Sequence, residues 1–574
     1  MPPNPGMAGD PSLAAIASNW IFKFNSARRA REPASAMAEL FSPDPWWRDH
    51  LALTWDLRTF HGLSDILGFL AGTLSRAGTG PITLAPHSGQ LVQMGGQISF
   101  IYASFTFVTK FATCSGGVKL LQGQDGHWRA WNVYTRIEEL KGCAQDLQRL
   151  NIRDSQVDDD FDVVILGGGQ CGLQLAAASR AIGMRVLIVE QNARLGDQWR
   201  RHYDPLRLHL PKQHSQFLYR SFPPSTPLYP SKDDIAMFLE QYSQTCHLNV
   251  LYSSRVQNAT FDDSSNTWVL DVLQSGGSSR LVRSSHVVLA TGILGALPVM
   301  PNLSGKSVYR GASLHSVEYK NGAHWRGKRA IVVGAGTSGH DIAEDLHRHG
   351  AHVLMVQRSP TAVVSKHLAS IYFAQHYQEG ISPDTVDRAL ESTPVLLNRE
   401  LAAAAASYMQ QMDAPLRAGL GRAGFLFRHP DPAEMLYERF GGYYVDTGEP
   451  FDAAIIEGKI NIKAGIPLTS FTQRGLRFAD GSEVFADLIV FATGFETSGM
   501  RALAGQLVGA GIGDTLREPW GLDEEGEVKA VWRSSGHPHL WYHGGDFKAA
   551  RYYSKLVALQ ILATKLGILD RYQS

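Results

Sequence analysis

The first quarter of the chain shows helical spacing of apolar residues followed by strand-like alternation. Apolar positions recur at helical intervals over residues 13–31 and again over 63–74. Residues 96–113 and 117–138 instead carry β-branched and aromatic side chains in the alternation typical of strands. Helices followed by a curved antiparallel sheet form an α+β arrangement. We therefore expect a separate α+β domain over residues 1–155.

From Phe161 onward the pattern changes to short, fully apolar runs that alternate with helical segments. This alternation is typical of βαβ units built on a parallel sheet. A chain of 574 residues is also too long for one hydrophobic core. The Asp-rich segment 156–161 predicts a linker. The predicted fold class is therefore α/β, with two dinucleotide-binding units after the α+β domain. We divide this part into residues 156–305, 306–450 and 451–574, the last returning to the first unit.

Composition and charge argue against several classes of partner and site. The formal net charge is +0, with no long run of one sign, which argues against nucleic acid or an anionic membrane as a partner. The four cysteines form no CxxC pair, so neither a disulfide framework nor a zinc site is expected. We therefore expect the protein in a reducing compartment. No signal peptide or membrane span is recognisable, so a cytoplasmic protein is expected.

The first glycine-rich loop follows the apolar run 161–166. Gly167, Gly169 and Gly172 fit the motif GxGxxG. The first glycine allows a tight turn, the second lets the backbone approach a pyrophosphate, and the third lets the helix pack closely on the strand. A helix over 173–182 directs its positive end at the phosphates. The next strand ends in Glu190, where a carboxylate can accept ribose hydroxyls. Strand, loop, helix, strand and acid together predict dinucleotide binding.

A second loop follows the apolar run 329–333. It consists of Gly334, Gly336, Thr337, Ser338 and Gly339, and we expect a helix over 340–349 after it. The following strand ends in Gln357 and Arg358 instead of an acid. Because a guanidinium binds a 2′-phosphate that a carboxylate would repel, this predicts NADPH over NADH. The alternative is a surface arginine at a strand end. A third match to the pattern, 419–424, follows no strand and is interpreted as a loop.

Between the two loops, residues 309–319 match FxGxxxHxxxY with Tyr at the first position, and include His315. Further motifs are Gly196-Asp197-Gln198-Trp199-Arg200, Ala290-Thr291-Gly292, Ala492-Thr493-Gly494-Phe495, and the segments 206–213 and 229–242. With these motifs, residues 161–500 resemble the flavin-containing monooxygenases, and the segments 206–213 and 229–242 resemble the plant YUCCA branch, which converts indole-3-pyruvate to indole-3-acetate.

This resemblance implies an enzyme with FAD at the first loop and NADPH at the second. It implies that reduced flavin forms a C4a-hydroperoxide with O₂ and transfers one oxygen to a small substrate, an N or S nucleophile or an α-keto acid. The cofactor-binding residues expected from the motifs include Gln198, Trp199, Thr291, Gly292, Thr493, Gly494 and, at a strand end, Asp546. His315 would order the junction of the two units. No metal is expected, because the histidines 537, 539 and 543 lack Cys or carboxylate ligands beside them.

His209 marks a departure from the wider family, which often has Asn two residues before Pro-Lys. The resemblance implies that His209 lies near the flavin, where it could bond to or protonate the peroxide. The alternative is a role in packing or loop rigidity.

Two further segments are less specific. Residues 47–62 give the N-terminal domain a resemblance to the NTF2-like (SnoaL-like) cone fold, in which the aromatic residues are interpreted as core. The insertion 366–450 is predicted to be largely helical and to cover the substrate entrance or make a subunit contact, so a homodimer is left open.

Three rival functions stay open at this stage. A flavin disulfide reductase would need a paired redox cysteine, which is missing near Cys171. A Baeyer–Villiger enzyme would end the central motif in Trp rather than in Tyr319-Lys320. The third is a flavin-bearing interaction protein with vestigial oxidase activity.

Overall fold

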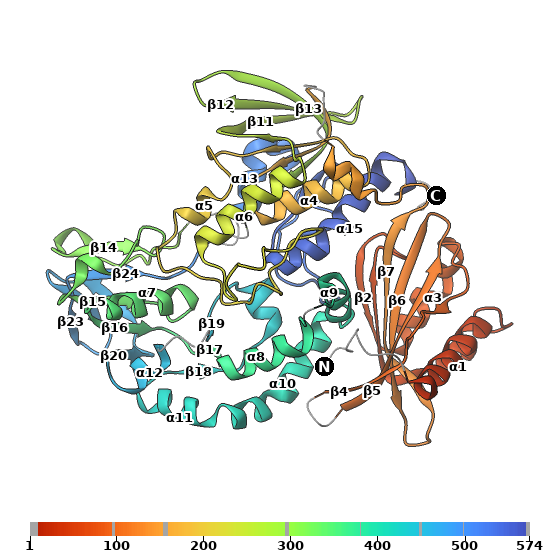
Figure 1. Cartoon of the computed structure of the whole chain (residues 1–574), viewed down its shortest axis with the longest axis horizontal. Helices are drawn as coiled ribbons and strands as arrows, with labels where there is room; N and C mark the ends of the chain where they lie inside the picture. Colours follow the sequence, from red (N-terminus) through yellow and green to blue (C-terminus); the bar gives the residue numbers. More distant parts are fainter. Residues whose placement is uncertain are drawn as a thin grey trace.

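The computed structural model describes residues 10–94, 98–152, 159–292, 298–378, 380–446, 451–496 and 499–569. Residues 156–158 of the predicted linker 156–161 lie outside these residues. Three bodies are visible in Figure 1: an N-terminal sheet with its helices, and two α/β units with helices packed between and around them. In the part of the chain that is described, no helix combines the length and apolar character needed to cross a bilayer.

The N-terminal domain is a curved sheet with helices on one face. The strand order is β2-β1-β7-β6-β5-β3, with β4 also paired to β5. All pairs are antiparallel except β1 with β7, which is parallel. The expected helices and strands are present, although β1 and β2 precede the second long helix. The elements are α1 (Pro11–Ala27), α2 (Pro33–Ala38), β1 (Phe41–His50), β2 (Leu57–His61), α3 (Leu63–Arg76), β3 (Thr83–Leu84), β4 (Gln90–Met94), β5 (Ile98–Val108), β6 (Ala112–Gln122), β7 (Trp128–Leu140) and η1 (Leu147–Asn151).

The first α/β unit has the strand order β10-β9-β8-β13-β12-β11, with β25 paired to β13. Its central strands are parallel and buried, whereas β11 to β13 form an antiparallel extension. The elements are β8 (Asp160–Leu166), α4 (Gln170–Ala181), β9 (Val186–Val189), α5 (Asp197–Arg200), α6 (Lys232–Thr245), β10 (Val250–Leu251), β11 (Ser254–Asp262), β12 (Thr267–Gln274) and β13 (Ser279–Leu289). From the C-terminal part come α13 (Gly499–Val508), α14 (Ala510–Gly513), β25 (Leu540–Tyr542) and α15 (Phe547–Lys565).

The second α/β unit is a fully parallel sheet in the order β14-β24-β15-β16-β20. Because β20 and β24 lie beyond residue 450, the chain returns to the first unit only after β24, later than the predicted boundary at 451. The elements are η2 (Lys306–Val308), β14 (Ala312–His315), η3 (Ala323–Trp325), β15 (Arg329–Val333), α7 (Thr337–Arg348), β16 (His352–Gln357), β20 (Ile460–Ala464), β21 (Leu468–Phe471), β22 (Gly475–Phe478), β23 (Glu483–Phe485) and β24 (Leu488–Phe491).

The segment from residue 366 to 446 is largely helical, as predicted, and ends in a small parallel sheet of order β18-β17-β19. The third GxGxxG match is the end of helix α11 and its following turn, so its interpretation as a loop was wrong. Gly419 packs there against Ile456, whose Cδ1 would lie 2.8 Å from an added Cβ. The elements are β17 (Thr361–Val364), α8 (Lys366–His376), α9 (Pro383–Glu391), α10 (Val395–Met412), α11 (Ala414–Arg422), β18 (Phe427–Arg428), the π-helix η4 (Glu434–Glu438), β19 (Tyr443–Val445) and α12 (Phe451–Ile456).

Candidate functional site

The first glycine-rich loop joins β8 to α4 with the geometry that a pyrophosphate requires. Gly167 has φ 110°, and a Cβ there would lie 2.5 Å from the Ala290 carbonyl oxygen. A Cβ on Gly172 would lie 2.0 Å from the oxygen of Gly167. The middle residue, Gly169, has no atom closer than 3.6 Å to such a Cβ, so the loop is open on that side. Helix α4 starts at Gln170, three residues earlier than expected, and presents its N-terminal amides to this opening.

Glu190 lies just after β9, where the sequence placed it. Its carboxylate is buried and accepts hydrogen bonds from the Gly168 amide (2.7 Å) and from the amide and side chain of Asn192 (2.8 and 2.7 Å). The acid is therefore held against the loop. Its binding to ribose hydroxyls stays a prediction.

The second loop repeats this construction between β15 and α7. Gly334 has φ 116°, and a Cβ on Gly339 would lie 2.0 Å from the Gly334 oxygen. At Gly336 the nearest atom to an added Cβ is 3.8 Å away, so this loop is open too. Helix α7 begins at Thr337 and places Ser338 in its first turn; the Thr337 hydroxyl donates to the Tyr443 carbonyl (3.2 Å).

The end of β16 differs from the end of β9 as the sequence predicted. Gln357 is fully buried and bonds to Thr361 and Leu426, so it is structural. Arg358 is exposed, and within the described part of the chain its guanidinium has no hydrogen-bond or ion-pair partner. A second arginine, Arg439, lies near this strand end, since its guanidinium donates to the Ser359 hydroxyl (3.4 Å). Sequence reasoning missed Arg439 because nothing around it in the sequence is distinctive.

Unsatisfied polar atoms gather beside the first loop. Among the described residues, Gln198 Oε1, Trp199 Nε1 and Thr291 Oγ1 are buried without a hydrogen-bond partner. Gln198 also faces Gly169, since its Nε2 is the atom closest to a Cβ there. Buried polar groups are almost always paired in a folded protein. These atoms therefore fit a polar ligand, such as a dinucleotide, at this loop.

The two Ala-Thr-Gly motifs stand at the two places where the chain passes between the units. Gly292 follows β13 and has φ 106°. At the return crossing, the Thr493 hydroxyl donates to the Val299 carbonyl (2.5 Å), and the Val299 amide donates to the Gly494 carbonyl (2.9 Å). Thr493 thus ties the two crossings together, and its predicted contact with a cofactor stays a prediction.

His315 ends the edge strand β14 and lies beside the same crossing. Its ring packs on Phe495 with centroids 5.7 Å apart, and burial lowers its pKa. Its role in ordering the junction between the units stays a prediction.

His209 connects the first unit to two elements outside it, helix α7 and strand β19. Its Nε2 lies 3.0 Å from Asp341 Oδ1 on α7, and its Nδ1 lies 2.6 Å from the Val445 carbonyl oxygen of β19. Both partners can accept hydrogen bonds, so this geometry favours the protonated ring, in which both nitrogens donate. Burial opposes this charge, but the carboxylate of Asp341 and the Val445 carbonyl raise the pKa of His209. We call this group of three the His209 clasp; it favours the loop-rigidity alternative for His209.

Asp546 follows β25 and caps α15, accepting from the Ala549 amide (2.7 Å). The residue before it, Gly545, packs on the first loop: its carbonyl accepts from Gln170 Nε2 (3.4 Å) and Cys171 Sγ (3.5 Å). The start of α15 is therefore part of the first site. Contact of Asp546 with the cofactor itself stays a prediction.

A largely apolar cavity of about 290 Å³ lies next to the His209 clasp. Leu210 and Val445 form its wall on that side, and helices α8, α10 and α11 enclose the rest, among them Phe373 and Met409. Arg417 lines it as well and stacks on the ring of Phe427, with no carboxylate partner among the described residues. A larger hollow, about 540 Å³, lies among α1, α2 and α3 and borders neither loop.

The three histidines near the C-terminus have partners within the fold. His543 bonds to Ser554 (3.0 Å), His539 lies 3.0 Å from the Ser285 carbonyl oxygen, and His537 packs on Trp268. In the described ranges, no three His, Cys, Asp or Glu side chains gather as metal ligands. All four cysteines are free, and burial raises the pKa of Cys171, the opposite of a reactive thiol.

Residues 164–392 match the family model described as pyridine nucleotide-disulphide oxidoreductase. The N-terminal domain lies outside that match. The chain is 32% identical over 342 residues to indole-3-pyruvate monooxygenase YUCCA1 of Oryza sativa subsp. japonica, covering 58% of this chain and 77% of that protein.

Two solved structures share the fold. One is cyclohexanone monooxygenase from Rhodococcus sp. Phi1 bound to NADP⁺, with 15% identity, a TM-score of 0.50 and coverage of 71% of this chain and 85% of that one. The other is OTEMO in complex with FAD and NADP, with 17% identity, a TM-score of 0.51 and coverage of 71% and 85%.

Proposed function

This chain belongs to the flavin-containing monooxygenases, in the YUCCA-like branch, and we propose that it oxygenates a small organic acid with an apolar body. It is a flavin-dependent monooxygenase that uses FAD and NADPH. The single observation that carries the substrate class is the cavity beside the His209 clasp, where Arg417 lines a mostly apolar wall. The Asp413 carboxylate lines it too and accepts a hydrogen bond from the Ser365 hydroxyl (2.6 Å).

The two nucleotides occupy the two glycine-rich loops. FAD fits the first loop, where Glu190 and the unsatisfied atoms of Gln198, Trp199 and Thr291 surround the opening. NADPH fits the second, where Arg358 stands at the strand end and can bind the 2′-phosphate bidentately. When bound, FAD would supply the redox and oxygen-activating chemistry that the reaction needs, with NADPH as the reductant.

The substrate pocket is the cavity of about 290 Å³, enclosed by α8, α10 and α11. Its wall at Leu210 and Val445 is shared with the His209 clasp, which ties the cavity to the junction of the units. Apolar walls of this kind exclude water, and a few polar groups orient the ligand. Arg417 is the group that would bind a carboxylate.

We infer that the substrate is an α-keto acid, as in the relative that acts on indole-3-pyruvate. The balanced reaction consumes the α-keto acid, O₂, NADPH and a proton. It yields the acid one carbon shorter, CO₂, water and NADP⁺: the bond between the keto carbon and the carboxylate breaks, and a new bond to oxygen forms at the keto carbon. The protein's own share is to hold substrate and cofactors in register and to keep water out.

The decisive experiment uses the purified, FAD-loaded protein. NADPH should bleach the visible flavin absorbance without oxygen, and admitting O₂ with indole-3-pyruvate should release indole-3-acetate and CO₂. Arg417→Met should raise KM for the keto acid by about tenfold or more, the loss expected for a charge-assisted hydrogen bond. Arg399→Met is the matched control, since Arg399 lies on α10 and pairs with Asp431 and Glu438. Protein that stays colourless after reconstitution with FAD would refute the assignment, and an unchanged KM in Arg417→Met would refute the substrate class.

A further inference from the structure

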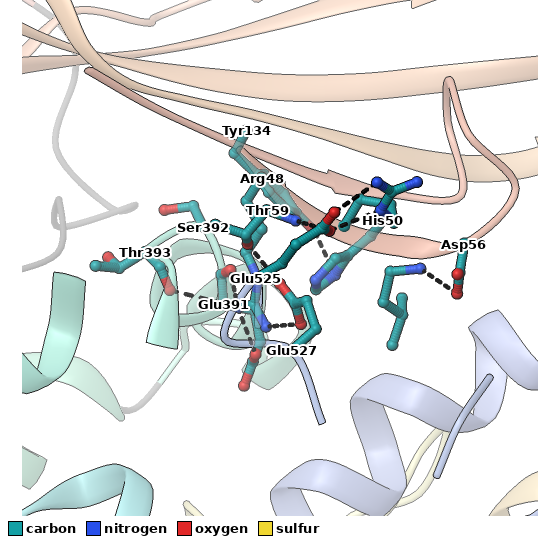
Figure 2. Close-up of polar contacts among 12 residues, drawn as sticks. Arg48, His50, Asp56, Thr59, Tyr134, Glu391, Ser392, Thr393, Glu525 and Glu527 are labelled. Carbon is teal, nitrogen blue, oxygen red and sulfur yellow. Dashed lines mark hydrogen bonds and ion pairs between the residues drawn. The ribbon is translucent and has the colours of Figure 1, made fainter. Parts of the chain in front are cut away.

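The N-terminal domain buries a polar sheet face against the flavin-binding unit. Side chains alternate along β1 and β7: Trp47 and Val133 face the helices of the domain, whereas Arg48, His50 and Tyr134 face outward. An outward polar face normally contacts water, yet Arg48 and His50 are at most 1% exposed and Tyr134 only 3%. Figure 2 shows Arg48 pointing at Glu391 of α9 and at Glu527. His50 and Tyr134 both contact the hydroxyl of Tyr552 on α15.

Arg48 is the centre of this interface. Its Nε and Nη2 donate two parallel hydrogen bonds to the Glu527 carboxylate (2.7 and 2.9 Å). Its Nη1 donates to the Glu391 carbonyl (2.7 Å) and lies 3.2 Å from the Glu391 carboxylate. A buried arginine with one partner removed would leave a charge uncompensated, which is strongly destabilising. The N-terminal domain and the last turn of α9 are therefore fixed to one another.

Glu391 extends the contact to helix α15. Its Oε1 accepts from Lys548 Nζ (2.5 Å) and its Oε2 from the Tyr553 hydroxyl (3.0 Å). Burial opposes ionisation, but the charges of Lys548 and Arg48 lower the pKa of Glu391 to about 2. One carboxylate thus receives donors from the N-terminal domain and from α15 at once.

Lys548 lies in the first turn of α15, two residues after the Asp546 cap. The residue before that cap, Gly545, accepts hydrogen bonds from Gln170 and Cys171 at the start of α4. Side-chain contacts lead from Arg48 through Glu391 to Lys548, and the three-residue backbone step from Lys548 to Gly545 connects them to the first glycine-rich loop. The pair of Arg58 with Glu525 crosses the same interface, is partly exposed and does not touch Glu391.

We propose that Arg48 is a positioning residue for the FAD site, supplied by the N-terminal domain and acting through Glu391 and Lys548. The N-terminal domain is then a built-in part of the flavin-binding unit and not a separable interaction module. The inference rests on the proposed function in one respect, that FAD is the nucleotide at the first loop.

The test compares Arg48→Lys with Arg58→Lys in the full-length, FAD-loaded protein. Lysine keeps the charge but cannot form the two-pronged contact. The readouts are the rate of FAD release, followed by the rise of free-flavin fluorescence, and the visible circular dichroism of bound FAD. We expect Arg48→Lys to release FAD at least tenfold faster and to change the dichroism, and Arg58→Lys to stay within twofold of the wild type.

Release and dichroism equal to the wild type in Arg48→Lys would overturn the proposal, even if the thermal midpoint falls, because the residue would then only hold the domains together. If Arg48→Lys does not fold, Tyr553→Phe carries the test, since it removes one donor to Glu391 and no charge; it should release FAD faster, and an unchanged rate overturns the proposal. Glu391→Gln combined with Arg48→Lys should be no worse than the poorer single variant, and additive effects would contradict coupling through Glu391. A wild-type protein that binds no FAD would instead refute the proposed function.

Discussion

The imidazole of His209 and the carboxylate of Asp341 meet between the two nucleotide-binding units, with Nε2 and Oδ1 3.0 Å apart. Asp341 also accepts from the Tyr203 hydroxyl (2.7 Å), so one residue of α7 holds both ends of the segment 203–209. These two bonds fix the position of residues 203–209 relative to α7, the helix that starts at the second loop. A proton on His209 is part of this arrangement, because the ring has acceptors on both sides.

We predict that the His209 clasp weakens as the pH rises. The folded-state pKa of His209 is raised, so its contribution is complete below the unfolded value near 6.5 and is lost as the pH rises through the folded pKa. Asp341→Asn should cost about 1–3 kcal/mol of stability in mildly acidic buffer, the range for a charged hydrogen bond. Thermal unfolding midpoints of both proteins from acidic to alkaline pH measure this.

The difference between wild type and Asp341→Asn should shrink on the alkaline side. A difference that is the same at every pH would show that the proton on His209 is not involved. Tyr203→Phe is the control, because it removes a hydrogen bond to the same carboxylate without removing a titrating group.

Arg358 should select the phosphorylated nucleotide. Arg358→Ala is expected to raise KM for NADPH at least tenfold, the cost of about 1.4 kcal/mol or more, while KM for NADH changes little. Steady-state flavin reduction with each nucleotide measures the two values. Arg329→Ala serves as the control, since Arg329 is exposed at the opposite end of the same sheet. Equal loss with both nucleotides would contradict a 2′-phosphate contact.

Gly172→Ala should abolish tight FAD binding. The new Cβ would lie 2.0 Å from the Gly167 oxygen, so the loop or α4 must move. Gly421→Ala is the matched control within the third GxGxxG match, because no atom lies within 4 Å of a Cβ there. It should bind FAD normally and gain up to about 1 kcal/mol from helix propensity. The measurement is the flavin content of the two purified proteins. Full FAD occupancy in Gly172→Ala would show that this loop is not the FAD-binding loop.

Ala406→Leu should narrow the proposed substrate cavity. Ala406 lines it from α10, so added carbons should raise KM for an aromatic keto acid more than for a small one such as pyruvate. FAD release should not change. Ala404→Leu, on the exposed side of the same helix, is the control. A KM that moves equally in both variants would place the substrate elsewhere.

Local pattern was enough to predict the two loops, because apolar strand, glycine spacing and terminal residue lie within about thirty positions of one another. The helix after the second loop began three residues earlier than expected, since Gly336 already serves as its cap. The partners of His209 were beyond such reasoning: Asp341 and Val445 lie 132 and 236 residues away.

The docking of the N-terminal domain was equally invisible in the sequence. Arg48 stands in a strand pattern whose outward residues are expected to face water, and its partner Glu527 is 479 residues away. The third glycine match lies in a segment that was itself predicted to be helical, yet it was predicted to be a loop because it follows no strand. Its first two glycines, Gly419 and Gly421, instead lie within α11.

The coincidence of the two crossings between the units has a mechanical consequence. Val299 and Thr493 to Phe495 run side by side and are bonded to each other, so both covalent connections pass through one narrow neck. Rotation of the second unit about this neck would require the contacts of Asp341 with His209 and Tyr203 to open. Those side-chain bonds, and not the covalent connections, therefore set the resistance to such a rotation.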